Sequence, residues 1–280
     1  MIVHFNGSFM PKENVRISPD DRGFLFADGV YEVICTWNGK LFQAEAHFAR
    51  LARSLEALRI PQPSLAQLRD AATALLAMNG LDREGGRIYL QITRGVATRG
   101  HAFPDEPPAP TVYASAAPYT PPRDKWAHGV PAILVPDIRW ARCDIKSLAL
   151  LPNVLASQRA SEAGAYDAIL VRDGAITEGS HTSVCAVFDG CLVTHPLTHH
   201  ILGSVTRDTV LGLCGALGIP TRESPILEET LSHATEMMFL GTTTGIMPII
   251  AIDGAPVGSG APGPITRRLQ EALHAMMLGG

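Results

Sequence analysis

Residues 137–148 read DIRWARCDIKSL, and the rest of the chain is best interpreted outward from the lysine in this stretch. The chain has 23 lysines and arginines, but its lysines are only Lys12, Lys40, Lys125 and Lys146. Lys146 alone precedes a strongly apolar segment, residues 148–151. Apolar surroundings disfavour the ammonium form, so they lower the pKa of a lysine and make its amine available as a nucleophile or base. The same pattern is typical of a lysine whose stem lies on the core while its ammonium reaches water.

The composition excludes several classes of protein. Hydrophobic residues make up 46% of the 280 residues, which allows a sizeable core and two domains of ordinary size. The net charge of −4 disfavours a nucleic-acid partner, because binding to phosphates requires a basic surface. Five scattered cysteines without a C-x-x-C pair indicate neither a disulfide framework nor a structural zinc site. We find no signal peptide and no apolar run near the ~20 residues that span a bilayer. We therefore expect a cytoplasmic protein without a membrane partner.

Turn and periodicity signals predict a mixed α+β fold. Asn-Gly or Asp-Gly pairs at 6–7, 38–39, 173–174, 189–190 and 253–254 predict hairpins, because a type I′ turn requires positive φ at both central residues. Strands are predicted at 30–37, 41–44, 87–93, 111–116, 130–135, 168–172, 175–178, 184–188, 192–195 and 237–240, and helices at 48–58, 64–80, 153–163, 207–217 and 265–277. The proline-rich segment 119–125 reads as a linker between a smaller N-terminal domain, residues 1–118, and a larger C-terminal domain, residues 126–280.

Two turns rich in small residues are candidate anion sites. Residues 203–207, GSVTR, open a predicted helix, so their backbone amides and the Thr206 hydroxyl suit a phosphate. A plain helix N-cap explains the same pattern. Residues 241–245, GTTTG, form a similar hydroxyl-rich turn, for which an ordinary turn is the alternative.

Two polar segments are candidate ligand sites. Arg94, Arg99 and His101 lie on a glycine-containing loop without an acid among them, and they could clamp a carboxylate. An exposed basic loop is the alternative. In residues 177–183, TEGSHTS, Glu178 could bind a protonated ring nitrogen while the hydroxyls orient a ligand, and the alternative is a polar loop.

Two further patterns are weaker. Residues 258–263, GSGAPG, match G-x-G-x-x-G, but the prolines within and after the match and its place near the C-terminus argue against a dinucleotide site. His195, His199 and His200 have no carboxylate or cysteine in helical register to complete a ligand set, so we expect no metal.

Several motifs, in order along the chain, resemble the fold-type IV aminotransferases, which depend on pyridoxal 5'-phosphate. Residues 21–24 (DRGF) and 28–33 (DGVYEV) are similar to the opening of that family, and residues 137–148 to its Schiff-base lysine segment. Residues 177–180 and 205–207 follow at the expected places. The resemblance extends to the final helix. It implies a two-domain α+β fold, with a smaller N-terminal α/β sandwich domain and a larger C-terminal domain with a β-barrel-like core.

The resemblance also implies roles for the matching residues. Lys146 forms the Schiff base with the cofactor and moves the proton, while Glu178 pairs with the pyridine nitrogen. The phosphate is bound by Arg50, Val205, Thr206 and either Thr242 or Thr243. Leu202 packs against the ring. The substrate carboxylate is trapped by Tyr31, Arg99 and His101, and the partner subunit of a homodimer can lend trap residues.

The Arg99-Gly100-His101 loop resembles that of the D-amino-acid aminotransferases within the family. It implies transamination between a D-amino acid and a 2-oxo acid, of the D-alanine and 2-oxoglutarate type. The chain departs from the family at His181, a pocket-lining position that is often serine, and in the turn at 242–245, which is one residue short. The alternatives are a branched-chain L-aminotransferase, an R-selective amine transaminase, an aminodeoxychorismate lyase, a metal hydrolase or a non-catalytic binding protein.

Overall fold

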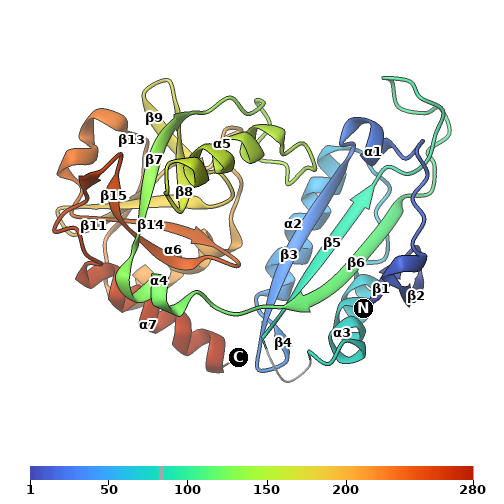
Figure 1. The fold of residues 1–280 in the computed structure, drawn as a ribbon, viewed down its shortest axis with the longest axis horizontal. Coiled ribbons are helices and arrows are strands. Elements are labelled where there is room, and N and C mark those ends of the chain that lie inside the picture. The colour runs from blue at the N-terminus through green and yellow to red at the C-terminus, as the bar shows by residue number, and fades with distance from the viewer. Residues whose placement is uncertain (82–84, 280) are drawn as a thin grey trace. The chain divides into compact units, whose positions relative to one another are not determined.

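The computed structural model describes residues 1–81 and 85–279 (Figure 1). The chain divides into two compact units. The first unit contains Met1–Thr120 and the short segment Ile145–Ala149, and the second contains Pro121–Asp144 and Leu150–Gly279. Lys146 therefore belongs to the first unit, although the chain on both sides of its segment belongs to the second.

All five hairpins predicted from Asn-Gly and Asp-Gly pairs are present. The residues that flank each pair face each other across the hairpin, as Phe5 faces Ser8 and Arg172 faces Ala175. The first residue of every pair has a φ between 46° and 51°, and each following glycine has a φ between 74° and 86°. Both values are positive, as a type I′ turn requires. These short signals were reliable because asparagine and aspartate tolerate the left-handed region and glycine adopts it without steric cost.

The first unit is built on a six-stranded antiparallel sheet of the order β2-β1-β6-β5-β3-β4. Its strands are β1 (Ile2–Phe5), β2 (Ser8–Pro11), β3 (Gly29–Trp37), β4 (Lys40–Leu41), β5 (Gly86–Thr93) and β6 (Thr111–Pro118), and its helices are α1 (Arg22–Phe26), α2 (Ala44–Ala57) and α3 (Leu65–Met78), with a 3-10 turn at Lys12–Asn14. Helix α2 contacts β3, and α3 contacts β6. The apolar face of α2, with Phe48, Leu51 and Leu55, is buried in one core with Ile34 and Ile92 of the sheet.

The second unit is built on a ten-stranded sheet, in which nine strands follow the order β12-β11-β10-β14-β15-β7-β8-β9-β13 and β16 pairs with β15. Its strands are β7 (Val130–Pro136), β8 (Asp167–Arg172), β9 (Ala175–Gly179), β10 (Ser183–Phe188), β11 (Cys191–Thr194), β12 (Thr221–Glu223), β13 (Ile226–Leu227), β14 (Glu236–Gly241), β15 (Gly245–Ile252) and β16 (Ala255–Pro256). Its helices are α4 (Arg123–His128), α5 (Leu151–Glu162), α6 (Val205–Leu217) and α7 (Pro264–Gly279), with a 3-10 helix at Glu228–His233. The sheet is curled into a half-barrel around a core that includes Ile169, Val184, Phe239 and Met247. The predicted α+β class is confirmed.

Three helix starts show why these elements begin where they do. Ser64 Oγ accepts a hydrogen bond from Gln67 N at the start of α3, as the S-x-x-Q pattern predicts. Ser204 Oγ accepts from Arg207 N at the start of α6. The carboxylate of Glu236, from β14, accepts hydrogen bonds from Ile265 N and Thr266 N in the first turn of α7. Each side chain satisfies amides that the helix itself leaves without acceptors.

Some predictions of local structure were wrong. The predicted strand at 41–44 ends at Leu41, because Gln43 adopts a left-handed conformation and α2 begins at Ala44. Strand β15 was missed, since Pro248 interrupts its signal. Pro248 lies one residue before the pairing with β7 begins, so it occupies an edge position on that side, where a proline is tolerated. Among the described residues, no helix combines the length and apolar character needed to cross a bilayer.

Candidate active site

Lys146 is held at the start of β3 by backbone hydrogen bonds. Tyr31 N donates to Lys146 O at 3.1 Å, and Leu148 N donates to Gly29 O at 3.0 Å. Lys146 N donates to the hydroxyl of Ser54, on α2, at 3.3 Å. The segment thus lies beside β3 and is fixed to α2, so the position of the lysine is set by the first unit.

The amine of Lys146 lies against an aromatic face. Its Nζ is 4.2 Å from the ring centroid of Tyr31, and the Tyr31 ring stacks with that of Tyr89 at 6.0 Å. An aromatic face attracts an ammonium group and also remains in contact with the neutral amine. The predicted Schiff-base lysine and the predicted substrate residue Tyr31 are therefore neighbours within one unit.

The same unit contains a buried acid–base cluster that feels the charge of Lys146. Glu32, on β3, is fully buried and accepts hydrogen bonds from Arg50 Nε at 2.7 Å, Arg50 Nη2 at 2.8 Å and His47 Nδ1 at 2.9 Å. Burial alone would raise the pKa of Glu32. The charge and hydrogen bonds of Arg50 outweigh it, with help from His47 and the charge of Lys146, and lower this pKa to about 2. Glu32 is consequently ionised at neutral pH.

His47 and Arg50 have different charge states in this cluster. Burial lowers the pKa of His47 by more than Glu32 raises it, so the imidazole is neutral at pH 7 and its Nδ1 proton is donated to Glu32. Arg50, the predicted phosphate ligand, is buried and directs two guanidinium nitrogens at Glu32. The predicted ligand is thus pre-oriented by a partner on β3.

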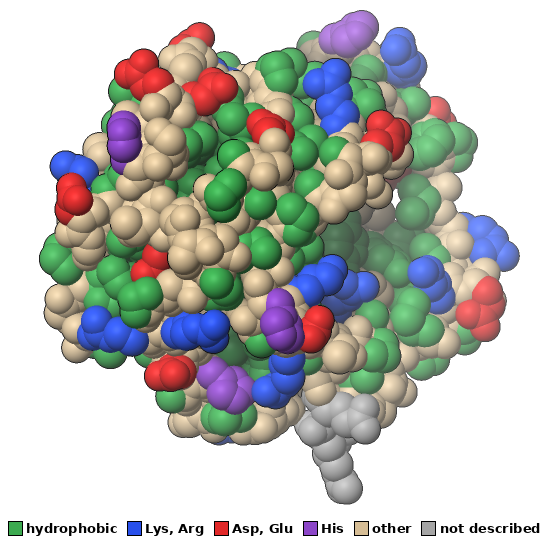
Figure 2. Space-filling model, turned by 60° about the vertical axis from the view of Figure 1, so that its left-hand side comes forward, with side chains coloured by type: hydrophobic (Ala, Val, Ile, Leu, Met, Phe, Trp, Pro, Cys, Tyr) green, Lys and Arg blue, Asp and Glu red, His purple; other side chains and the backbone are tan. Residues whose placement is uncertain are grey.

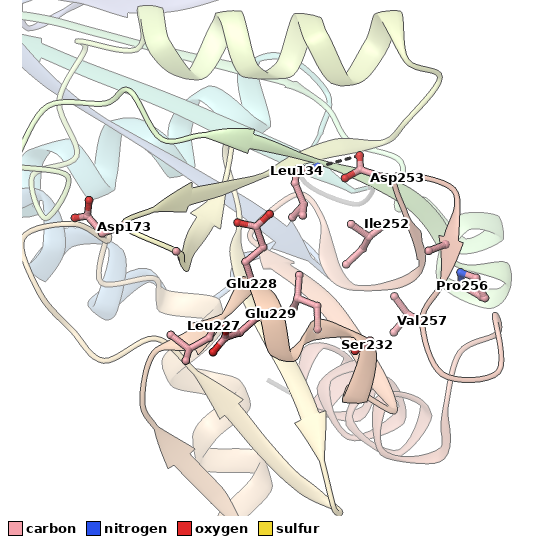
Figure 3. A pocket seen from close by; sticks show the side chains of 13 residues that line it. Leu134, Asp173, Leu227, Glu228, Glu229, Ser232, Ile252, Asp253, Pro256 and Val257 are labelled. Atoms are coloured by element: carbon pink, nitrogen blue, oxygen red, sulfur yellow. Dashed lines mark hydrogen bonds between the residues drawn. The ribbon is translucent and has the colours of Figure 1, made fainter.

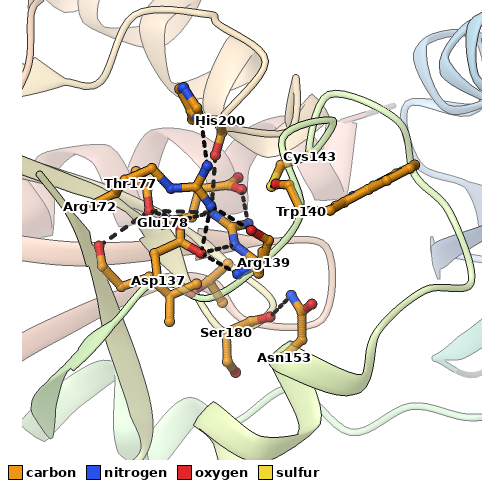
Figure 4. A network of polar contacts seen from close by, with 12 residues as sticks. Asp137, Arg139, Trp140, Cys143, Asn153, Arg172, Thr177, Glu178, Ser180 and His200 are labelled. Carbon is orange, nitrogen blue, oxygen red and sulfur yellow. Dashed lines mark hydrogen bonds and ion pairs between the residues drawn. The ribbon is translucent and has the colours of Figure 1, made fainter.

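In the second unit, Glu178 is held by a buried arginine (Figure 4). Arg139 Nη1 donates to Glu178 Oε2 at 2.6 Å, and the same guanidinium donates to both oxygens of Asp137 at 2.9 Å. Its Nη2 also donates to Thr177 Oγ1 at 3.2 Å and to His200 O at 3.0 Å. Arg139 thus bridges two carboxylates and fixes the orientation of Glu178.

The charges of this network follow from its geometry. Burial alone would lower the pKa of Arg139, but the hydrogen bond to Asp137 and the charge of Glu178 raise it. Burial alone would raise the pKa of Asp137, whereas the hydrogen bonds and charge of Arg139 lower it to about 2. At neutral pH, a permanent cation therefore lies between Asp137 and Glu178.

The predicted phosphate segment forms the start of α6. Val205 and Thr206 are its first two residues, whose amides have no acceptors within the helix and lie at the positive end of its dipole. Arg207, buried in the next position, donates to His195 O at 3.0 Å and to Glu223 Oε2 at 2.6 Å. Leu202 lies three residues before the helix and is partly exposed.

The other predicted threonines lie in the turn between β14 and β15. Gly241 pairs with Gly245, so residues 242–244 form the turn. Thr244 is buried, and its carbonyl accepts from Trp126 Nε1 at 2.6 Å. Thr242 and Thr243 are partly exposed.

His181 lies beside a buried aspartate. Its Nδ1 is 3.0 Å from Ser180 Oγ and 3.5 Å from Asp167 Oδ2. Asp167 also accepts hydrogen bonds from the hydroxyls of Ser180 and Thr182, while half of the His181 side chain is exposed. The next residue but one, Ser183, has a buried hydroxyl without a hydrogen-bond partner in the part of the chain that the structure describes.

The three basic residues of the predicted carboxylate clamp are separated by the structure. Arg94 is buried, donates to both carboxylate oxygens of Asp28 at 2.7 and 3.0 Å, and also donates to the carbonyls of Leu58 and Arg59. Arg99 and His101 are exposed on the loop. Arg94 therefore supports the loop, and Arg99 and His101 remain the exposed candidates for the predicted clamp.

The three histidines considered as metal ligands contact other groups of the protein. His195, His199 and His200 face the carbonyl of Pro196, Asp144 and Arg172, respectively. Within residues 1–81 and 85–279, no group of three or more potential metal ligands comes together. A separate hollow of about 760 Å³ in the second unit has an apolar wall with Leu134, Ile252 and Val257 and several acids nearby, and none of the predicted site residues lines it (Figure 3).

Sequence reasoning missed Glu32, His47, Asp137 and Arg139 as parts of the site. A signal was present for Glu32, a single acid in the apolar strand β3. His47 and Arg50 are three apart, so they share one helix face. No local signal connects Arg139 with Glu178, because the two are 39 residues apart.

The donors described here fit pyridoxal 5'-phosphate. This cofactor requires a lysine for its Schiff base, a charged partner for its ring nitrogen and donors for its phosphate. In the first unit, Lys146 supplies an amine at an aromatic face. In the second unit, Glu178 is a buried and oriented carboxylate, and α6 begins with a threonine and with amides that have no acceptor within the helix. The unpartnered hydroxyl of Ser183 lies close in sequence to Glu178. The fold and these types of donor are those of a pyridoxal-phosphate-dependent enzyme.

The amino-transferase class IV family model matches residues 29–252, and the chain belongs to this family. The D-alanine aminotransferase of Bacillus licheniformis is 42% identical over 279 residues, which is 99% of this chain and 98% of that protein. That of Staphylococcus aureus (strain COL) is 40% identical over 97% of this chain and 96% of its own. Among solved structures, the branched-chain amino acid aminotransferase of Escherichia coli has a TM-score of 0.92 at 26% identity, covering 99% of this chain and 95% of that one. The branched-chain aminotransferase of the archaeon Thermoproteus uzoniensis, solved with norvaline, has a TM-score of 0.88 at 28% identity, covering 100% and 95%.

The predicted family, fold type and cofactor are confirmed by these matches. The chain is a pyridoxal-phosphate-dependent aminotransferase.

Proposed function

We propose that this enzyme exchanges the amino group of a D-amino acid with the oxo group of a 2-oxo acid, converting D-alanine and 2-oxoglutarate to pyruvate and D-glutamate. The observation that carries the proposal is full-length similarity, near 40% identity, to several proteins named D-alanine aminotransferase. The Arg99-Gly100-His101 loop, which suggested this substrate class, is exposed and available to a ligand.

Lys146 has two tasks in the proposed mechanism. Bound pyridoxal 5'-phosphate supplies an electron sink that stabilises charge at the substrate Cα. The amine of Lys146 would hold the cofactor. The free amine of Lys146 would accept the substrate Cα proton as a general base and donate it again as a general acid. The aromatic face of Tyr31 keeps Nζ in place during both transfers.

The remaining residues of the proposed cofactor site bind the cofactor and orient it. Glu178, fixed by Arg139, would pair with the protonated ring nitrogen, and Leu202 would pack against the ring. The residues that would hold the phosphate are those at the start of α6, those in the turn between β14 and β15, and the oriented guanidinium on α2: Val205, Thr206, Thr242, Thr243 and Arg50.

The substrate carboxylate is bound by Tyr31, Arg99 and His101, and His181 lines the pocket. Selectivity for the D-isomer requires that these groups hold the carboxylate where only that isomer presents its Cα proton to Lys146. Because Arg99 and His101 are cationic or polar donors, they suit a carboxylate, and Arg99 can bind it with two parallel hydrogen bonds.

The enzyme is proposed to be a homodimer in the cytoplasm. Four apolar side chains of the second unit are exposed, which is typical of a subunit contact. Trp140 precedes the Lys146 segment, and Leu151, Val154 and Leu155 lie in the first turns of α5 after it. On the face in Figure 2, basic and acidic side chains are interspersed, so this face does not suit nucleic acid. The five cysteines are not paired with one another, which is compatible with a reducing compartment. Sedimentation should give twice the chain mass of 29.9 kDa.

Borohydride reduction tests the assignment of Lys146. The purified protein should be yellow, and reduction followed by peptide mapping should place the cofactor on Lys146. Attachment to Lys12, Lys40 or Lys125 would contradict the assignment. Lys146→Ala should abolish turnover. Lys125→Ala is the matched control, since Lys125 also lies over a tyrosine ring, at 4.9 Å from Tyr166, and should retain activity.

A second candidate function is branched-chain L-amino-acid transamination, because the structural neighbours with TM-scores of 0.92 and 0.88 are named branched-chain aminotransferases. Assays of D-alanine and L-leucine, each with 2-oxoglutarate, separate the two candidates. Faster turnover of L-leucine would refute the D-amino-acid proposal.

A further inference from the structure

The ring of Phe26, the last residue of α1, lies close to two guanidinium groups and an imidazole. The Cζ atom of Arg22 is 4.9 Å from the ring centroid, and that of Arg99 is 5.2 Å from it. The ring of His101 is 5.6 Å away, centroid to centroid. Both proposed carboxylate ligands of the loop therefore lie against one aromatic side chain.

Arg22 fixes the backbone between these two ligands. Its side chain is only 3% exposed, and its Nε donates to Asp28 Oδ2 at 2.9 Å. Its Nη1 donates to the carbonyl of Gly100 at 2.6 Å, and Gly100 is the residue between Arg99 and His101. A charged donor at this distance forms a strong hydrogen bond, because it is largely excluded from water.

The loop is also attached on both sides of this point. On the N-terminal side of Gly100, Arg22 N donates a hydrogen bond to Gly95 O at 2.9 Å. On the C-terminal side of Gly100, the ring centroid of Phe103 lies 3.7 Å from Arg94 Cζ. Arg94 is paired with Asp28, which also binds Arg22. The backbone is thus anchored while the side chains of Arg99 and His101 remain exposed.

We propose that Arg22 and Phe26 are positioning residues that hold Arg99 and His101 in the orientation that binds the carboxylate of the amino-acid and oxo-acid substrates. The inference rests on the proposed function, in which Arg99 and His101 bind that carboxylate. An exposed arginine loses much side-chain freedom when it binds a ligand, and orienting it beforehand lowers this cost. Arg22 itself is buried and directed at Asp28 and Gly100, so it acts through the loop.

The test is the steady-state kinetics of Phe26→Leu in the cofactor-bound enzyme. Leucine keeps an apolar side chain but removes the π face. We expect KM for D-alanine and for 2-oxoglutarate to rise roughly tenfold, as the loss of two cation–π contacts implies. kcat should stay within about twofold and the visible spectrum of the cofactor should be unchanged, because binding rather than chemistry is affected.

Three variants complete the experiment. Phe26→Tyr keeps the aromatic face and should restore a KM near that of the parent. Arg22→Lys keeps a cation beside Asp28 but loses the planar fork that also reaches Gly100 O, so it should raise KM for both substrates. Phe24→Leu is the matched control, since Phe24 lies on the same helix with 74% of its surface exposed, and its KM should stay unchanged.

Several results would overturn the proposal. These are an unchanged KM for Phe26→Leu, an equal rise for Phe24→Leu, a defect in Phe26→Tyr as large as in the leucine variant, or parallel losses of kcat and thermal stability. Arg99→Ala distinguishes the two levels of inference. If Arg99→Ala raises KM while Phe26→Leu does not, the positioning role fails and the proposed function stands. If neither variant changes KM, both the positioning role and the assignment of Arg99 to the substrate carboxylate fail.

Discussion

Replacing Glu32 by glutamine should destabilise the first unit in a pH-dependent way. Glu32→Gln preserves the shape of the side chain but removes the negative charge that faces Arg50. The pKa of Glu32 falls from the ordinary value of 4.5 to about 2 in the folded chain. At 1.36 kcal/mol per pH unit, this difference corresponds to about 3 kcal/mol of folding free energy at pH 7. The value agrees with the ~3–5 kcal/mol lost when one partner of a buried ion pair is removed.

The sign of the pH dependence is fixed by the lowered pKa. A carboxylate with a lowered folded-state pKa contributes its full stabilisation above its ordinary value of 4.5, and loses it as the pH falls toward about 2. The difference in unfolding free energy between the parent and Glu32→Gln should therefore be largest at pH 7. It should shrink to about 1 kcal/mol at pH 3.

Urea unfolding of the cofactor-free chains, followed by circular dichroism at pH 7, 5 and 3, measures this difference. Equal protein concentrations are needed, because association of subunits changes the apparent stability. Glu45→Gln is the control: its partner is Arg69 in an exposed ion pair, so the change should cost less than about 1 kcal/mol. Equal midpoints for the parent and Glu32→Gln at pH 7, or a difference that stays constant down to pH 3, would refute the reasoning.

Three further changes test other parts of the fold. Arg139→Met removes the cation between two buried carboxylates, so the unfolding free energy should fall by ~3–5 kcal/mol at pH 7. The loss should lessen at low pH, where the carboxylates become protonated. An unchanged urea midpoint at pH 7 would contradict this. Glu236→Gln weakens the cap of α7 and should cost ~1–2 kcal/mol, read from the urea midpoint. Gly258 has a φ of +53°, and Gly258→Ala places a Cβ against the carbonyl of Thr235. The midpoint of thermal unfolding should therefore fall by several degrees. An unchanged midpoint would show that the loop can shift to make room for the Cβ.

The parts of the fold that local chemistry determines could be predicted from the sequence. The Asn-Gly and Asp-Gly pairs located hairpins because two adjacent residues suffice to set a type I′ turn. The start of α3 followed from Ser64 and Gln67 in the same way. Strand β15 was missed because Pro248 interrupts its own pattern, while its pairing with β14 and β7 determines its state.

The candidate site shows the same division. Lys146 and Glu178 were named because they lie in distinctive segments. Their partners were not, because Arg139 reaches Glu178 only after β7 and β9 have been placed in one sheet. Arg94 was grouped with Arg99 and His101 by proximity in sequence, whereas its buried pairing with Asp28 depends on a residue 66 positions earlier.

The route of the chain through its two units has a consequence for how the protein can be divided. A fragment ending at Thr120 would contain Tyr31, Ser54 and the Glu32 cluster, but not the lysine that they surround. A fragment beginning at Pro121 would carry Lys146 without those neighbours. Closing the contact between Val30 and Ser147 also brings together distant parts of the chain, which slows folding. Cutting the chain at the boundary between the units therefore separates the reactive amine from its surroundings.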